Sequence, residues 1–140
     1  MNSFRFIVAL TLLLALPGAH AGVAIVVHPS AGFDALSGDE VARIFLGKSK
    51  RLPDGKQAVP LNQDAGNSAR DFFRENVLNK SQSQYDAYWA KLAFTGKGTP
   101  PKNAGNDQAI KKLVADNPNL IGYIDSGSVD SSVKVVFTLN

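Results

Sequence analysis

The sequence predicts an α/β domain with a mixed sheet flanked by helices. Two observations lead to this prediction. Short runs rich in β-branched residues alternate with longer segments whose apolar residues recur at helical spacing. The segments follow the order strand, helix, strand, three helices, strand, strand, which implies crossover connections between the strands of one sheet. The sequence contains no internal repeat, low-complexity tract or linker that would divide it further.

The first strand is expected at Val23–Val27, where five apolar residues follow one another. Such a continuous run is typical of a strand buried on both faces, and we expect it to be parallel to its neighbours. Pro29 ends the run because proline cannot donate to a ladder. His28 is expected to be a strand-end residue rather than a metal ligand or a base. Further strands are expected at residues 59–62, 120–124 and 133–139.

The expected helices have recognisable starts. Ser37 stands three residues before Glu40, which is the spacing of a capping box, and Gly47 is placed to end that helix. Ser81 opens another helix, and Asn106 opens one that runs to residue 115. The helix after Ser81 carries an apolar stripe that we interpret as core, the alternative being an exposed aromatic binding face. The stripe consists of Tyr85, Tyr88, Trp89 and Leu92.

Residues 1–21 have the composition of a cleavable signal peptide. Arg5 precedes an apolar run that is too short to span a bilayer, and the small-x-small sequence AHA of a cleavage site follows. The alternative is an uncleaved membrane anchor, but Pro17 and Gly18 break the run where a membrane helix would continue. We therefore expect export to the periplasm and a single domain over residues 22–140.

Composition excludes several classes of function. The sequence has no cysteine, so disulfides, thiol catalysis and cysteine-ligated metals are excluded, and no metal or other cofactor is expected. The formal net charge of +3 suits an anionic ligand. Because the basic residues are interspersed rather than gathered in a run, no nucleic-acid partner is expected.

The connection between residues 59 and 73 carries the clearest chemistry. A strand at residues 59–62 is followed by a glycine-containing turn, and Ser68 then stands three residues before Asp71, as in a variant of the capping box. A helix start fed by such a loop offers free N–H groups and the positive end of the helix dipole, which together bind oxyanions. The loop of residues 63–67 lies beyond the carboxyl end of a strand, where α/β sheets bind ligands. The alternative is that Ser68 simply caps a helix, since no Walker-type or dinucleotide motif is present.

Six segments occur in the order found in periplasmic phosphate-binding proteins of ABC transporters, and the sequence resembles that family over nearly all of residues 22–140. The segments are AIVVH (24–28), ARIFLG (42–47), PDG (53–55), VPLNQDAGNS (59–68), FTGKG (94–98) and IGYI (121–124). The resemblance implies the fold of one lobe of a type 2 periplasmic binding protein. The segment that would form the first lobe of those two-lobed proteins is absent.

The resemblance also implies which residues contact the ligand. Family members have an arginine, an aspartate two residues later, and then a Ser-Gly-Thr run that opens the helix. Asp64 matches the aspartate, which in the family accepts the proton of hydrogen phosphate. Asn62 stands at the arginine position, so the bidentate guanidinium contact is lost. The expected ligand-binding residues are Asp64, Gly66, Asn67, Ser68, Ala69 and Arg70.

These departures limit the expected affinity. Arg70 either reaches back as a substitute for the missing arginine or faces solvent. Without the first lobe the site stays open to water, where each charged contact is weaker. We therefore expect a Kd on the order of 0.1 mM or poorer, equivalent to about 5 kcal/mol.

The expected function is the binding of phosphate or a similar oxyanion without catalysis, since the sequence has no histidine dyad, paired carboxylates or Gly-x-Ser-x-Gly motif. The alternative is a non-enzymatic interaction or sensory module that kept the lobe and contacts an envelope protein. The expected small-molecule partner is inorganic phosphate or a similar oxyanion. The possible protein partners are a membrane transporter, a porin, a sensor protein, or a second copy of the chain in a homodimer.

Overall fold

The computed structural model describes residues 22–140, so the signal-peptide prediction for residues 1–21 lies outside the described residues. A five-stranded mixed sheet runs through the molecule in the order β3-β2-β4-β1-β5. The strands are β1 (Val23–Val27), β2 (Val59–Asn62), β3 (Lys102–Asn103), β4 (Leu120–Asp125) and β5 (Lys134–Leu139). Among residues 22–140, no helix has the length and apolar character needed to cross a membrane.

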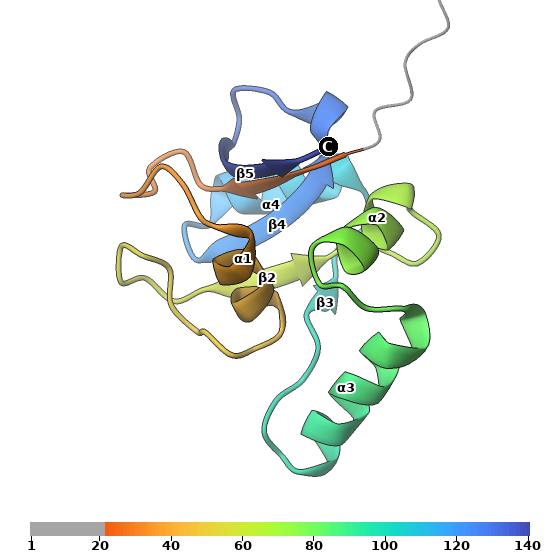
Figure 1. The fold of residues 1–140 in the computed structure, drawn as a ribbon. Coiled ribbons are helices and arrows are strands. Elements are labelled where there is room, and N and C mark those ends of the chain that lie inside the picture. Colours follow the sequence, from red (N-terminus) through yellow and green to blue (C-terminus); the bar gives the residue numbers. More distant parts are fainter. Residues whose placement is uncertain (1–21) are drawn as a thin grey trace, which may run out of the picture.

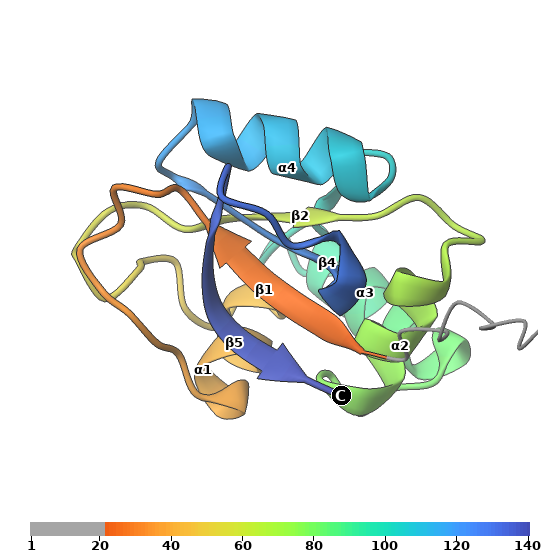
Figure 2. The same cartoon turned by 90° about the horizontal axis from the view of Figure 1, so that it is seen from above.

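Helices cover both faces of this sheet (Figures 1 and 2). The helices are α1 (Gly38–Phe45), α2 (Ser68–Asn76), α3 (Gln82–Phe94) and α4 (Asp107–Asp116), with a 3-10 turn η1 (Ser126–Ser128) after β4. One apolar cluster joins the sheet to α1, α2 and α3, and a second joins the opposite face to α4. The predicted α/β fold with a mixed, helix-flanked sheet is therefore confirmed. The two-residue strand β3 was not predicted.

The prediction that β1 is parallel to its neighbours is wrong. β1 pairs antiparallel with both β4 and β5, and the parallel pairs are those of β2 with β3 and β4. All five residues of β1 are nevertheless buried. Val23, Ile25 and Val27 belong to the cluster with α1 and α2, whereas Ala24 and Val26 pack on the α4 side. The continuous apolar run therefore reflects burial on both faces and carries no information about strand direction.

Three of the four predicted helix starts are capped as expected. Ser37, Ser81 and Asn106 each accept a hydrogen bond from the backbone N–H three residues later, at 3.1, 3.2 and 3.1 Å. At Ser81 the capping box is complete, because the Gln84 side chain accepts from the Ser81 N–H at 2.9 Å. These starts are thus satisfied by side chains of their own sequence.

The start of α2 differs from the prediction. Ser68 is the first residue of the helix, and Asn67, at the cap position, makes no capping hydrogen bond. The Asn67 amide instead donates to Gln63 Oε1 at 3.3 Å and to the Gly105 carbonyl at 3.2 Å. Asp71 pairs with an arginine of its own helix at 2.8 Å. The predicted capping box is therefore wrong, because groups from a neighbouring loop compete for the cap side chain.

Aromatic rings fix α2 over the sheet. Phe73 stacks on Tyr123 of β4 with ring centroids 4.1 Å apart and an interplanar angle of 7°. Phe45 of α1 meets the same Phe73 ring edge-on at 4.7 Å. Ala69, Phe73 and Val77 are buried, and the neighbouring Phe72 is only partly buried. The inward face of α2 thus joins two helices to the middle of the sheet.

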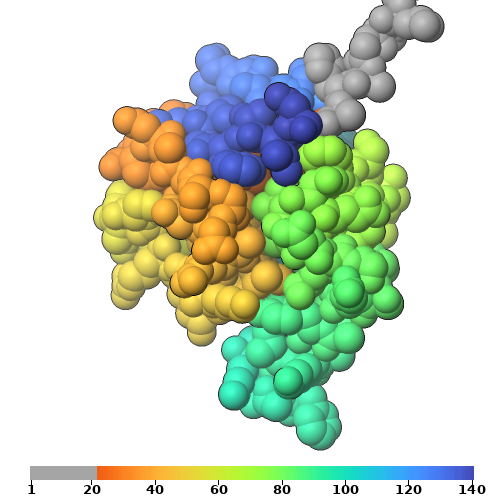
Figure 3. Space-filling view, viewed as in Figure 1, coloured from red at the N-terminus to blue at the C-terminus, as the bar shows by residue number. Residues whose placement is uncertain are grey.

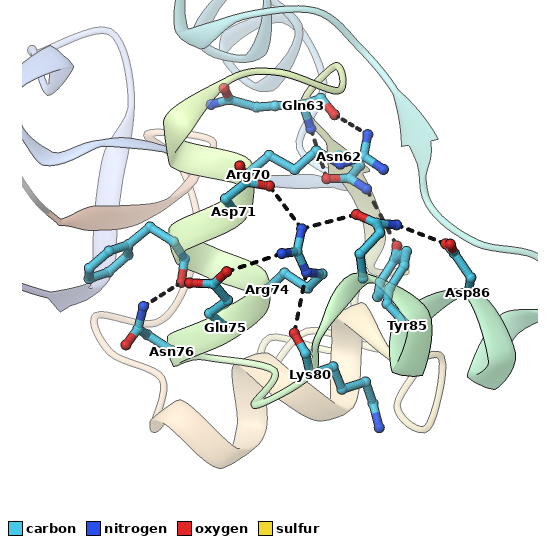
Figure 4. Close-up of polar contacts among 12 residues, drawn as sticks. Asn62, Gln63, Arg70, Asp71, Arg74, Glu75, Asn76, Lys80, Tyr85 and Asp86 are labelled. Atoms are coloured by element: carbon cyan, nitrogen blue, oxygen red, sulfur yellow. Dashed lines mark hydrogen bonds and ion pairs between the residues drawn. The ribbon is translucent and has the colours of Figure 1, made fainter.

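A buried arginine connects α2 to α3. Arg74 donates to the Lys80 carbonyl at 3.2 Å and to Gln82 Oε1 at 3.0 Å, and it pairs with Asp71 at 2.8 Å (Figure 4). Its side chain is only 10% exposed, so these oxygens replace the water that a guanidinium would otherwise need. The Arg74 side chain thus supports the turn between the two helices, together with the backbone bond from the Lys80 N–H to the Arg74 carbonyl at 3.0 Å.

Candidate functional site

The loop of residues 63–67 follows the carboxyl end of β2, as predicted. Because β2 and β4 are parallel, the turn after β4 lies at the same edge of the sheet, and so does the start of α4. These three segments enclose an open pocket of about 540 Å³. Its lining residues are Gln63, Gly66, Asn67, Ser68, Ala69, Asn106, Asp107, Gln108, Asp125 and Ser128.

The start of α2 presents hydrogen-bond donors to this pocket. Within residues 22–140, the N–H groups of Gly66, Ser68 and Ala69 have no hydrogen-bond partner. Gly66 has a φ of +93°, a conformation in which a side chain is strained, so the loop depends on glycine there. Free N–H groups at the positive end of a helix dipole attract negatively charged oxygens. The arrangement suits an oxyanion.

Two of the predicted residues lie beside the pocket rather than in its lining. Asp64 Oδ1 accepts from the Gly105 N–H at 3.1 Å, and the Asp64 N–H donates to the Gly105 carbonyl at 2.9 Å. Arg70 reaches back across the loop, but its Nη1 donates to the Gln63 carbonyl at 2.8 Å and to Asn103 Oδ1 at 3.1 Å. Four of the six predicted residues line the pocket: Gly66, Asn67, Ser68 and Ala69. The ligand contacts of all six remain predictions.

The wall opposite α2 carries carboxylates. Asp107 accepts from Gln63 Nε2 at 2.7 Å, from Ser128 Oγ at 2.7 Å and from the Asp125 N–H at 3.2 Å. Asp125 Oδ1 accepts from the Gly127 N–H at 2.8 Å. No lysine or arginine is among the lining residues of this pocket. A ligand with both oxygen acceptors and an O–H donor, such as a protonated oxyanion, therefore matches the two walls better than a fully ionised anion does.

Asn62, at the arginine position of the family, does not line this pocket. It is buried, and its Oδ1 accepts from the Tyr123 hydroxyl and, at 3.0 Å, from the Gln63 N–H. Its Nδ2 donates to the Tyr85 hydroxyl at 3.4 Å (Figure 4). Burial raises the pKa of the Tyr123 phenol well above its usual value, so that hydroxyl remains a donor. Asn62 thus serves a buried network that links β2 to β4 and α3.

Sequence reasoning missed part of the lining: Gln63, Asn106, Asp107, Gln108, Asp125 and Ser128. A clue was present, since polar residues follow both predicted strands that end at this edge. The prediction also needed the parallel pairing of those strands, which the sequence does not specify. Within residues 22–140, no group of three or more histidine or carboxylate side chains is arranged to hold a metal ion.

Known proteins resemble this chain in sequence and in fold. No family model matches the chain. The chain is 30% identical over 108 residues to the phosphate-binding protein PstS of Bacillus subtilis (strain 168), a match that covers 76% of this chain and 32% of that protein. An ABC-type phosphate transport receptor from Vibrio cholerae matches in structure with a TM-score of 0.65 and 21% identity, covering 82% of this chain and 45% of the receptor.

A second solved structure is a phosphate ABC transporter substrate-binding protein from Clostridium perfringens with bound phosphate. It matches with a TM-score of 0.61 and 27% identity over 82% of this chain and 44% of that protein. The chain thus spans about a third of the curated relative and less than half of either solved protein. Sequence and fold lead to one conclusion: the chain is related to the phosphate-binding proteins of ABC transporters and corresponds to a single-lobe part of them.

Proposed function

We propose that the chain binds phosphate or a similar oxyanion at the start of α2. The observation that carries this proposal is the uncapped helix start, where the N–H groups of Gly66, Ser68 and Ala69 are unpaired beside an open pocket. Ligand oxygens accept from these N–H groups, and the Ser68 hydroxyl adds a further donor. The names of the relatives, one with bound phosphate, favour phosphate as the ligand.

The charges around the pocket set the affinity and selectivity we expect. Asp107 and Asp125 repel a fully ionised anion, whereas a hydrogen phosphate ion donates its O–H to a carboxylate. Asp64 and Arg70 contribute by fixing the loop, through their bonds to Gly105 and Gln63. With no basic residue in the lining, the expected Kd is on the order of 0.1 mM or poorer. Phosphate is preferred over sulfate.

We also infer that the chain acts in the periplasm as a binding protein and not as an enzyme. The relatives are named as phosphate-binding or transport proteins. Within residues 22–140, the Ser68 hydroxyl makes no hydrogen bond to a histidine or lysine that would activate it as a nucleophile.

Isothermal titration calorimetry of residues 22–140 tests the proposal, with phosphate as the ligand and sulfate as the control at equal ionic strength. Heat is expected with phosphate and not with sulfate. Equal heats with phosphate and sulfate would show that the carboxylates do not select phosphate over sulfate. Sub-micromolar binding would contradict a site that is open and has no basic side chain.

A second function is favoured by the same lack of a basic side chain in an open pocket. In that case the lobe serves as an interaction or sensory module. It binds a transporter, a porin, a sensor protein or a second copy of the chain. This function would be supported if calorimetry detected no heat of binding with phosphate and the chain either formed concentration-dependent dimers or co-purified with one of these proteins. Phosphate-dependent heat from a monomer would argue against it.

A further inference from the structure

The segment between Asp86 and Asp107 has charges of one sign only. It contains Lys91, Lys97 and Lys102 and no carboxylate. It comprises the last turns of α3, the following loop and β3. Figures 1 and 3 show α3 and this loop projecting from the body that the sheet and the other helices form. We refer to residues 91–98, which include the end of α3, as the α3 tip.

A large apolar side chain is fully presented at the α3 tip. Phe94, the last residue of α3, is 93% exposed, whereas the other exposed large apolar residues among residues 22–140, Leu113 and Val129, are each 40% exposed. α3 attaches to the body through its buried residues Tyr85 and Trp89. Phe94 follows Tyr85 by about two and a half helical turns and so points to the opposite side of the helix. Phe94 therefore contributes nothing to the attachment of α3.

The surroundings of Phe94 are convex and basic. A Cβ atom built at the neighbouring Gly96 would meet no atom within 4 Å, so the chain leaves this turn uncovered. Lys91 and Lys97 flank Phe94 in the sequence, and both are exposed. Phe94 does not line the apolar pocket beside this loop, whose lining includes Trp89, Pro100 and Pro101. A protruding aromatic ring between lysines fits a broad, negatively charged and partly apolar surface.

We propose that the α3 tip docks on the surface of an anionic lipid bilayer. Phe94 inserts between the headgroups, and Lys91 and Lys97 approach the lipid phosphates. Aromatic side chains favour the membrane interface, and lysines near an anionic surface are attracted to it. A single ring with two lysines gives weak and reversible binding, since stable anchoring needs more apolar area. The tip shares no residue with the pocket at the starts of α2 and α4, so docking leaves that pocket accessible.

Co-sedimentation with lipid vesicles tests this inference. Residues 22–140 supply all five strands and both apolar clusters, so this part of the chain is used and its thermal unfolding confirms that it is folded. Binding is expected to vesicles that contain phosphatidylglycerol and not to vesicles of phosphatidylcholine alone. Raised salt is expected to weaken it, because the lysines contribute through screened charge. Absence of binding to the anionic vesicles would overturn the proposal.

Two double variants with matched chemistry locate the contact. Phe94→Ala with Lys97→Glu removes the ring and reverses one charge at the tip. Leu113→Ala with Lys112→Glu makes the corresponding change on the exposed side of α4, on the other face of the sheet. We expect the tip variant to lose at least about tenfold in vesicle affinity and the α4 variant to stay within about twofold of the wild type. Equal losses would show that net charge alone drives binding and would overturn docking through the tip.

Discussion

The starts of α2 and α3 differ in their side-chain caps. At α3, Ser81 and Gln84 satisfy each other's backbone N–H groups in a complete capping box. At α2, the Asn67 amide donates to the Gln63 side chain and to the Gly105 carbonyl, and no side chain caps the helix. The first two N–H groups of both helices lack a partner among residues 22–140, as is usual at helix starts. What distinguishes α2 is that its first residues, Ser68 and Ala69, line a pocket, and this is where we propose that the anion binds.

The largest expected effect concerns how α2 is held. Phe73 is buried and stacks on Tyr123, so Phe73→Ala is expected to lower the free energy of unfolding by about 3–5 kcal/mol. Urea denaturation measures this loss. Phe72→Ala is the matched control, since Phe72 is the neighbouring ring and only partly buried, and it should cost less than half as much. Similar losses in the two variants would show that the stack on Tyr123 is not what fixes α2.

A proline at position 68 removes a free donor of α2 while keeping the helix. Asn67 has φ −76° and ψ 129°, the extended conformation that a residue before proline needs, and proline is favoured at the first helical position. We expect Ser68→Pro to weaken phosphate binding by at least about tenfold, equivalent to about 1.4 kcal/mol, without loss of stability. Calorimetry compares it with Ser68→Ala, which keeps the N–H. Equal losses would assign the contact to the hydroxyl alone.

Replacing the serine at each helix start by alanine is expected to change the stability of the protein by different amounts. Ser81→Ala removes a capping bond and is expected to cost about 1 kcal/mol of unfolding free energy. Ser68→Ala removes no capping bond and is expected to change stability by less than about 0.5 kcal/mol. Chemical denaturation of both variants measures the difference. A loss at Ser68 as large as that at Ser81 would mean that the two starts are equivalent.

The smallest expected effect comes from the carboxylate wall. Asp125→Asn removes a negative charge but keeps an oxygen that accepts from the Gly127 N–H. We expect the Kd for phosphate to change by less than about twofold, because the loss of repulsion and the loss of one of two acceptors for the ligand's proton oppose each other and both are weak in an open, hydrated pocket. Asp116→Asn, at the far end of α4, is the control for net charge and should leave the Kd unchanged. A larger loss of affinity in Asp125→Asn would instead identify Asp125 as the acceptor of the ligand's proton.

Features set by neighbouring residues were predictable from the sequence. The caps at Ser37 and Ser81 and the end of β1 before Pro29 follow from residues a few positions apart, and the structure confirms them. The direction of β1, the strand β3 and the orientation of the Asn67 side chain depend on segments far away in the chain. Local spacing contains no information about such contacts.

The candidate site likewise has a part that neighbouring residues predict and a part that depends on distant segments. The loop and the first turn of α2 could be located from one continuous stretch of sequence. The opposite wall could not, because Asp107 reaches Gln63 and Ser128 only after β2 and β4 are paired side by side. Asn62 shows a further limit, since its match to a family position did not reveal that its side chain is used in the core.

The pairing of β1 has a consequence for the kinetics of folding. Val23 at the start of the described chain pairs with Asp125 of β4 and with Leu139 of β5, so β1 finds both partners near the other end of the sequence. Closing such long loops is entropically costly and slows folding. The pairing of β1 with β5 therefore has to wait until the last strand is available, whereas β2 pairs with β3 and β4 without it. During synthesis from the N-terminus, β1 has no partner strand until β4 and β5 have been made.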